Sequence, residues 1–153
     1  MNKEACFSHN TDNWKTPSVL YNAIVKDCHY IDLFPYCSML DQYENKDYHG
    51  KKLFINPPYS HLNTKKFKEY ITLLISQGNK IYLLIPSRTD TKIFQYLSVY
   101  CEAIIFFKGR LHFNDSKEPA PFPSCLMRLT NFRLFPTYVR FCSVEEFCGY
   151  EKQ

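Results

Sequence analysis

The stretch Leu53-Phe54-Ile55-Asn56-Pro57-Pro58-Tyr59 decides the fold. Its apolar residues predict a buried strand from Lys52 to Ile55, and the two prolines end that strand because each fixes φ near about −65° and lacks an N–H. Apolar residues at helical spacing then predict a helix over 63–77, capped by Asn63 and closed by Gly78. Lys80 to Ile85 reads as a second buried strand. A strand, a helix and a strand in this order predict a right-handed βαβ unit with parallel strands.

The rest of the chain continues this alternation. Further helices are predicted over 17–26 and 89–100, and further strands over 30–34, 103–107, 124–130 and 137–142. We therefore expect a single α/β domain over residues 1–153, in a compact and reduced Rossmann-like form. Its sheet should be mainly parallel with helices on both faces, and the last two strands should form an antiparallel hairpin at one edge.

Composition excludes several classes of function. The 153 residues carry a net charge of +4, which permits a polyanionic partner, and no apolar run approaches the roughly 18 residues of a membrane span. The first residues contain no apolar signal core, so we expect a cytoplasmic protein. Seven cysteines without a CxxC pair and five histidines without ligand spacing predict free thiols and no metal site.

The turn after the strand at 52–55 carries the chemistry. Asn56, Pro57, Pro58 and Tyr59 place an amide side chain, rigid carbonyl acceptors and an aromatic face close together. Such a set suits a planar amine, because the acceptors can hold its N–H groups while the ring stacks on its face. The turn therefore predicts methyl transfer to an exocyclic amino group.

Six short segments stand out in order along the chain: Trp14-Lys15-Thr16-Pro17, Asp32-Leu33-Phe34-Pro35, Phe54-Ile55-Asn56-Pro57-Pro58-Tyr59-Ser60, Ile85-Pro86-Ser87-Arg88-Thr89-Asp90-Thr91, Lys108-Gly109-Arg110-Leu111-His112-Phe113 and Ala120-Pro121-Phe122-Pro123-Ser124. Together they resemble the bacteriophage-type (Dam-like) DNA adenine methyltransferases. These small enzymes transfer a methyl group from S-adenosylmethionine to the N6 amino group of adenine in DNA. The resemblance covers about residues 13 to 130, and it implies a single methyltransferase domain of phage or prophage origin.

The resemblance implies a role for each residue of the turn. Asn56 and the backbone carbonyl of Pro57 would accept the two hydrogens of the target amine, and Tyr59 would stack on a base flipped out of the duplex. Pro58 belongs to the same catalytic turn. Two acceptors out of the ring plane favour a more tetrahedral nitrogen, which makes the amine a better nucleophile.

The resemblance also implies where cofactor and DNA bind. Asp32 would lie beside the charged methionine end of S-adenosylmethionine, and Trp14, Thr16 and Pro17 belong to the segment that closes over the cofactor, with Trp14 as a core or lid anchor. Arg88 and Asp90 would line the same cleft. DNA would meet loops at 60–68 and 110–121, or an oligomer; the residues assigned to it are Tyr59, Ser60, Lys65, Arg88, Asp90 and Arg110.

The chain departs from a full-size methyltransferase at two places. No glycine-rich turn follows Asp32, and only 23 residues separate Asp32 from Asn56, so the strand that usually ends in a ribose-binding carboxylate is missing. Asp41, Glu44 or Asp47 could supply that carboxylate, with Asp47 as the assigned residue. These departures leave two alternatives open: a degenerate protein that binds nucleic acid or cofactor without turnover, and methylation of another amine such as cytosine N4.

Overall fold

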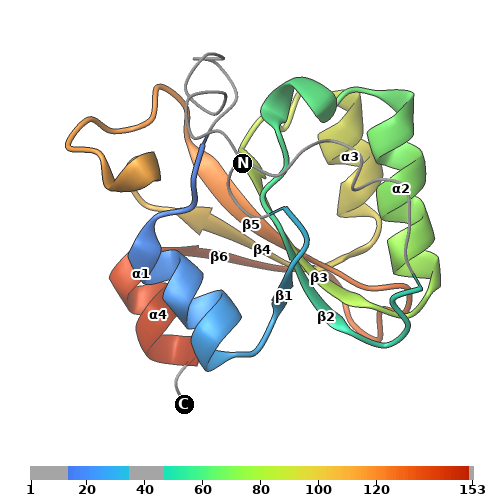
Figure 1. The fold of residues 1–153 in the computed structure, drawn as a ribbon. Helices are drawn as coiled ribbons and strands as arrows, with labels where there is room; N and C mark the ends of the chain where they lie inside the picture. Colours follow the sequence, from blue (N-terminus) through green and yellow to red (C-terminus); the bar gives the residue numbers. More distant parts are fainter. Residues whose placement is uncertain (1–13, 35–46, 152–153) are drawn as a thin grey trace, which may run out of the picture.

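A six-stranded mixed sheet forms the centre of the protein in this computed structural model, which describes residues 14–34 and 47–151 (Figure 1). The spatial order of the strands is β1-β2-β3-β5-β4-β6. Only β5 runs against the others, because it pairs antiparallel with both β3 and β4 while the remaining pairs are parallel. The strands are β1 Ile31–Asp32, β2 Lys52–Ile55, β3 Lys80–Pro86, β4 Cys101–Phe107, β5 Ser124–Leu129 and β6 Tyr138–Cys142.

The predicted hairpin between the last two strands is wrong. β6 lies in parallel against β4, so β4 separates it from β5. The connection between β5 and β6 crosses the start of β4, where the Arg133 guanidinium and the Thr137 hydroxyl both donate to the carbonyl oxygen of Cys101, at 3.4 and 2.8 Å. Burial is consistent with the arrangement, because the almost wholly buried β5 occupies a central position and the largely exposed β6 takes the edge.

Helices cover both faces of the sheet, as expected for an α/β fold (Figure 1). α2 Lys65–Ser76 and α3 Lys92–Ser98 pack on one face, in a core with the inward residues of β2, β3 and β5. α1 Ser18–Tyr21 and α4 Val144–Glu151 cover the other face. None of the helices in the described part of the chain is both long and apolar enough to span a bilayer.

Several predicted helices differ from those observed. The helix expected over 17–26 is a four-residue α1 that continues as a π-helix over Asn22–Asp27. α2 is capped by Thr64 rather than Asn63, since the Thr64 hydroxyl accepts from the N–H of Phe67 at 3.2 Å. The segment 108–113, expected to alternate as a strand would, forms no strand and leads into a 3₁₀ turn at Phe113–Asp115.

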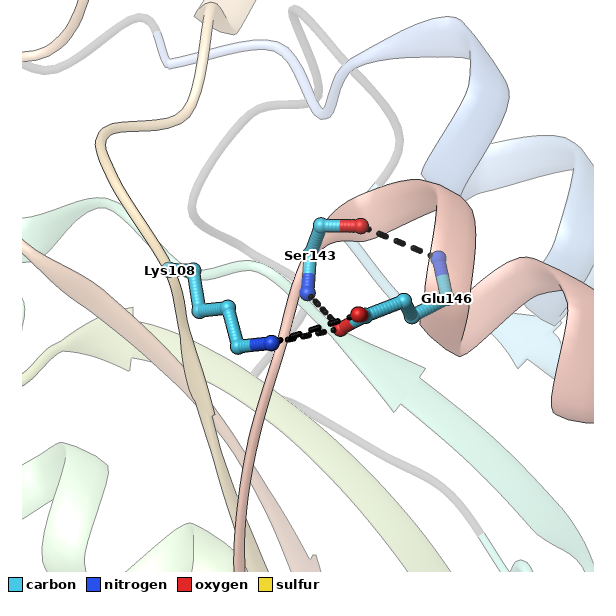
Figure 2. A network of polar contacts seen from close by, with 3 residues as sticks. All are labelled: Lys108, Ser143 and Glu146. Carbon is cyan, nitrogen blue, oxygen red and sulfur yellow. Dashed lines mark hydrogen bonds and ion pairs between the residues drawn. The ribbon is translucent and has the colours of Figure 1, made fainter.

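α4 was not predicted, although its start carries a capping box. Glu146 reaches back to accept from the N–H of Ser143 at 2.7 Å, and the Ser143 hydroxyl accepts from the N–H of Glu146 at 3.1 Å. Lys108, just after β4, donates to the same carboxylate at 3.1 Å (Figure 2). These bonds attach the start of α4 to the end of β4.

The cysteines of the described residues are all free thiols, as predicted. Four of them are buried: Cys101, Cys125, Cys142 and Cys148. They therefore act as small apolar core residues.

The carboxyl ends of β1, β2, β3 and β4 meet at one edge of the sheet. Asp32, Asn56 and Lys108 lie at this edge, as predicted. Because β5 runs in the opposite direction, its first residue Ser124 is opposite Pro86 at the same edge. This carboxyl edge is where ligands bind in open α/β sheets.

Candidate active site

The Asn56 side chain is fixed in orientation at the end of β2. Its Nδ2 group donates to the carbonyl oxygen of Trp14 at 2.6 Å and to the hydroxyl of Thr16 at 3.0 Å. A carbonyl oxygen can only accept, so the nitrogen must face Trp14 and the amide cannot be flipped. The Asn56 Oδ1 atom is buried and has no hydrogen-bond partner among the described residues. The site therefore presents an oriented acceptor.

Residues from a distant loop hold the Trp14–Ser18 segment in place. The N–H of Lys15 donates to the Asn114 side chain at 3.1 Å, and the N–H of Asn114 donates back to the Lys15 carbonyl at 2.9 Å. Asp115 accepts from the N–H of Ser18 at 2.8 Å, and this bond lowers the pKa of its carboxyl. Asn114 and Asp115 both have left-handed φ, near 59° and 50°. Asn and Asp tolerate that conformation better than other non-glycine residues, and here it aims both side chains at the segment.

Tyr59 belongs to a cluster of four aromatic residues. Its ring meets Phe113 and Phe122 edge-on, with centroids 6.2 and 5.5 Å apart, and Trp14 packs on the same two phenylalanines at 5.6 and 5.1 Å. Trp14 is thus an anchor of the core, as predicted. Although Tyr59 directly follows two prolines, it is half-buried and packs against both cores.

Burial of the Tyr59 hydroxyl has a clear electrostatic effect. The oxygen has no hydrogen-bond partner among the described residues, and burial raises the pKa of the phenol well above its ordinary value. A neutral phenol cannot act as a base near neutral pH. Tyr59 is therefore not a candidate general base.

Asp32 is a half-buried carboxyl at the end of β1. One of its oxygens accepts from the N–H of Phe34 at 3.0 Å. Burial raises its pKa from 3.8 to about 6, and the Phe34 bond opposes this only in part. A carboxylate with a raised pKa favours a cationic neighbour, so Asp32 suits a positively charged ligand group.

A further buried oxygen without a partner lies at the same edge. The Ser124 hydroxyl is buried at the start of β5 and has no hydrogen-bond partner among the described residues. Buried polar atoms are normally paired, so an unpaired one calls for a partner such as a ligand or a water molecule. Together with the Asn56 oxygen, the Ser124 hydroxyl makes the carboxyl edge a place that favours a polar ligand.

The other predicted site residues differ in burial and in position. Pro57 is buried, and the Pro58 carbonyl accepts from the N–H of His61 at 3.0 Å. Pro17 precedes α1 as its N-cap. Four assigned residues are exposed around the carboxyl edge, on segments that follow β2, β3 and β4: Ser60, Arg88, Asp90 and Arg110. Lys65 is exposed at the start of α2, 3.6 Å from Glu69.

The structure separates Asp47 from this group. Its neighbour Tyr48 accepts through its carbonyl oxygen from the Asn79 side chain at 2.7 Å, at the amino ends of β2 and β3. Asp47 therefore lies on the side of the sheet where β2 begins, whereas Asn56 lies where β2 ends. The alternatives Asp41 and Glu44 lie outside the described residues.

Sequence reasoning missed the residues that support the site. Asn114, Asp115 and Ser124 contribute through contacts with segments far away in the sequence, which local periodicity does not encode. The dipeptide Asn114-Asp115 was the one available signal, because both residue types are enriched at left-handed turns.

Comparison with known families identifies one family. The model of the family described as DNA N-6-adenine-methyltransferase (Dam) matches residues 4–122, which is more than half of the chain. The chain matches no curated protein and no solved structure. The matched range includes the oriented Asn56, the Tyr59 cluster and Asp32. This chain therefore belongs to the DNA N-6-adenine-methyltransferase (Dam) family.

Proposed function

We propose that the protein transfers a methyl group from S-adenosylmethionine to the N6 amino group of adenine in DNA. The observation that carries the proposal is the Asn56 amide, whose nitrogen is tied to the Trp14–Thr16 segment while its buried oxygen has no partner among the described residues. Such an oxygen is ready to accept one hydrogen of an amine. Membership of the Dam family supports adenine as the amine.

Asn56 and Pro57 act as acceptors for the target amine. Asn56 Oδ1 takes one N–H and the backbone carbonyl of Pro57 takes the other, which draws the nitrogen toward a tetrahedral geometry. The lone pair then points away from the ring, and the two oxygens stabilise the positive charge that grows on nitrogen during transfer. The fixed amide needs no reorganisation at that moment, which is the main electrostatic advantage of a preorganised site.

Tyr59 positions the base. In this proposal the accessible part of its ring stacks on an adenine flipped out of the duplex, while Phe113 and Phe122 hold the ring from the other side. Stacking of a base on an aromatic side chain is worth about 1–3 kcal/mol. That gain offsets part of the cost of unpairing and unstacking the base.

Asp32 and the Trp14–Pro17 segment hold the cofactor in this proposal. The half-buried carboxylate of Asp32 pairs with the ammonium group of the methionine end, and Thr16 and Pro17 border the same space. S-adenosylmethionine, when bound, supplies a methyl group on a positively charged sulfur. The buried oxygen of Ser124 provides a further polar contact at this edge.

A labelling experiment tests the proposal. Purified protein is incubated with radiolabelled S-adenosylmethionine and DNA of mixed sequence, and the DNA is digested to nucleosides for mass spectrometry. We expect label in N6-methyladenine, its loss in Asn56→Ala, and no change in Asn131→Ala, an exposed asparagine beyond the other end of β5. Label in N4-methylcytosine would reassign the substrate. Cofactor binding without any transfer would favour a degenerate protein.

A further inference from the structure

A groove of about 460 Å³ opens between the starts of α2 and α3. Thr64, Lys65 and Lys68 line it from α2, and residues at the start of α3 complete it, including Lys92 and Tyr96. Both helices begin at the carboxyl edge of the sheet, since α2 follows β2 and α3 follows β3 (Figure 1). The groove therefore lies at the same edge as Asn56 but outside the residues assigned above to amine and cofactor.

The charged side chains that line the groove are all positive. Lys65, Lys68 and Lys92 line it, and its lining contains no carboxylate. Glu69 lies 3.6 Å from Lys65, but both side chains are exposed, and such surface pairs contribute little. Three ammonium groups around one concave surface repel one another and favour an anionic occupant.

One of the lysines is held in position by a polar relay. The Thr72 hydroxyl donates its single hydrogen to the carbonyl oxygen of Lys68 at 2.6 Å, so the Tyr96 hydroxyl, 2.8 Å away, donates to Thr72. This bond fixes the Tyr96 ring against α2, and the Lys68 ammonium lies 4.1 Å from the ring centre. The cation is therefore partly ordered before any anion arrives, which lowers the entropy cost of binding.

We propose that this groove binds backbone phosphates of the DNA strand that contains the target adenine. The inference rests on the proposed function. Leu62, which also lines the groove, is three positions after Tyr59, so the groove begins within about 11 Å of Tyr59 along the chain. A DNA strand rises about 3.4 Å per nucleotide, so a phosphate at the near end of the groove would be about three nucleotides from the flipped base.

Salt-dependent binding tests the inference. The affinity of the full chain for a short duplex is measured by fluorescence anisotropy between 50 and 200 mM salt. Each phosphate contact contributes about 0.9 to the slope of log K against log salt, so Lys68→Gln/Lys92→Gln should lower the slope by about 1.8. The matched control Lys51→Gln/Lys80→Gln removes the same charge at exposed positions before β2 and at the start of β3, and its slope should equal that of the wild type.

The outcomes separate the two proposals. Equal slopes for the groove and control variants, with methylation of DNA intact in the wild type, would overturn the groove inference alone. Failure of the wild type both to bind DNA and to transfer label would overturn the proposed function, and the groove inference with it. Tighter binding of an RNA of the same sequence would overturn the assignment to DNA. Circular dichroism melts of all variants check that each is folded.

Discussion

The hydroxyl of Thr16 accepts a hydrogen bond from the side-chain nitrogen of Asn56 at 3.0 Å, and these two residues are 40 positions apart in the sequence. Thr16 is buried, with 6% of its surface exposed. Because Thr16 holds the Nδ2 atom of Asn56, the Oδ1 atom points toward the place proposed for the target amine. Thr16 is therefore a positioning residue as well as a border of the proposed cofactor space.

Replacing Thr16 by valine should slow methyl transfer more than it weakens cofactor binding. Valine keeps the shape but cannot accept from Asn56, and loss of a hydrogen bond worth about 1 kcal/mol corresponds to a fall of about fivefold in kcat. The KM for S-adenosylmethionine should change little. Steady-state kinetics at saturating DNA measures both constants.

Serine at position 16 is the matched control. Thr16→Ser retains the hydroxyl and should restore most of kcat. A rise in the KM for S-adenosylmethionine with an unchanged kcat in Thr16→Val would mean that Thr16 serves the cofactor alone and does not orient Asn56.

Replacing Ser143 by alanine should destabilise the protein by about 1 kcal/mol. The change removes the oxygen that accepts from the N–H of Glu146 at the start of α4. Urea unfolding at pH 7 measures the change, and Ser76→Ala, which alters an exposed serine at the end of α2, should cost less.

The same cap should depend on pH. The bonds from Ser143 and Lys108 lower the pKa of Glu146 below its ordinary value of 4.5, so its contribution is present above pH 4.5 and is lost as the pH falls through the lowered pKa. The stability difference between wild type and Glu146→Gln should therefore shrink in acid. A difference that stays constant from pH 7 to pH 3 would show that the charge of Glu146 contributes nothing.

The helix α4 illustrates what the sequence could and could not predict. The sequence Ser143-Val144-Glu145-Glu146 fits the capping-box pattern, so this helix was detectable from local signals. The place of β5 between β3 and β4 was not, because an apolar run predicts burial but does not name its neighbours. The bounds of β3, β4 and β5 were predicted to within about two residues, because each strand is a mostly apolar run.

The candidate site also has features that were predictable from the sequence and features that were not. Asn56 and Asp32 were predictable as strand ends, because Pro57 and the run before Pro35 mark where those strands stop. The contact of Asn56 with Thr16 and the hydrogen bonds between Asn114 and Lys15 depend on tertiary packing. The local sequence pattern does not predict contacts between residues that are far apart in the chain.

Tyr59→Phe should leave methylation nearly unchanged. The Tyr59 hydroxyl is buried without a partner among the described residues, so its removal should leave stability equal or slightly higher. Tyr59→Ala removes the ring, and kcat/KM should then fall by about tenfold to a hundredfold, as expected for the loss of one stacking contact. A phenylalanine variant as inactive as the alanine variant would show that the hydroxyl takes part in the reaction.

Asp32→Asn should stabilise the free protein above pH 6 and weaken its response to cofactor. The pKa of Asp32 is raised from 3.8 to about 6 on folding, so the folded state resists ionisation; the resulting penalty is absent below pH 3.8 and complete above about pH 6. Asparagine can still accept from the N–H of Phe34 but carries no charge. Its melting temperature should therefore exceed that of the wild type at pH 7.5 and equal it near pH 3.5.

Bound cofactor should stabilise the wild type more than it stabilises Asp32→Asn. If Asp32 pairs with the ammonium group of S-adenosylmethionine, saturating cofactor raises the wild-type melting temperature at pH 7.5 by more than that of Asp32→Asn, because only the carboxylate gains an ion pair on binding. Thermal shifts at pH 7.5 with and without cofactor measure the difference, with Glu145→Gln, at an exposed carboxyl in α4, as the control for loss of one negative charge. Equal shifts in wild type and Asp32→Asn would place the ammonium group elsewhere and leave the raised pKa of Asp32 as a cost of folding without a role in binding.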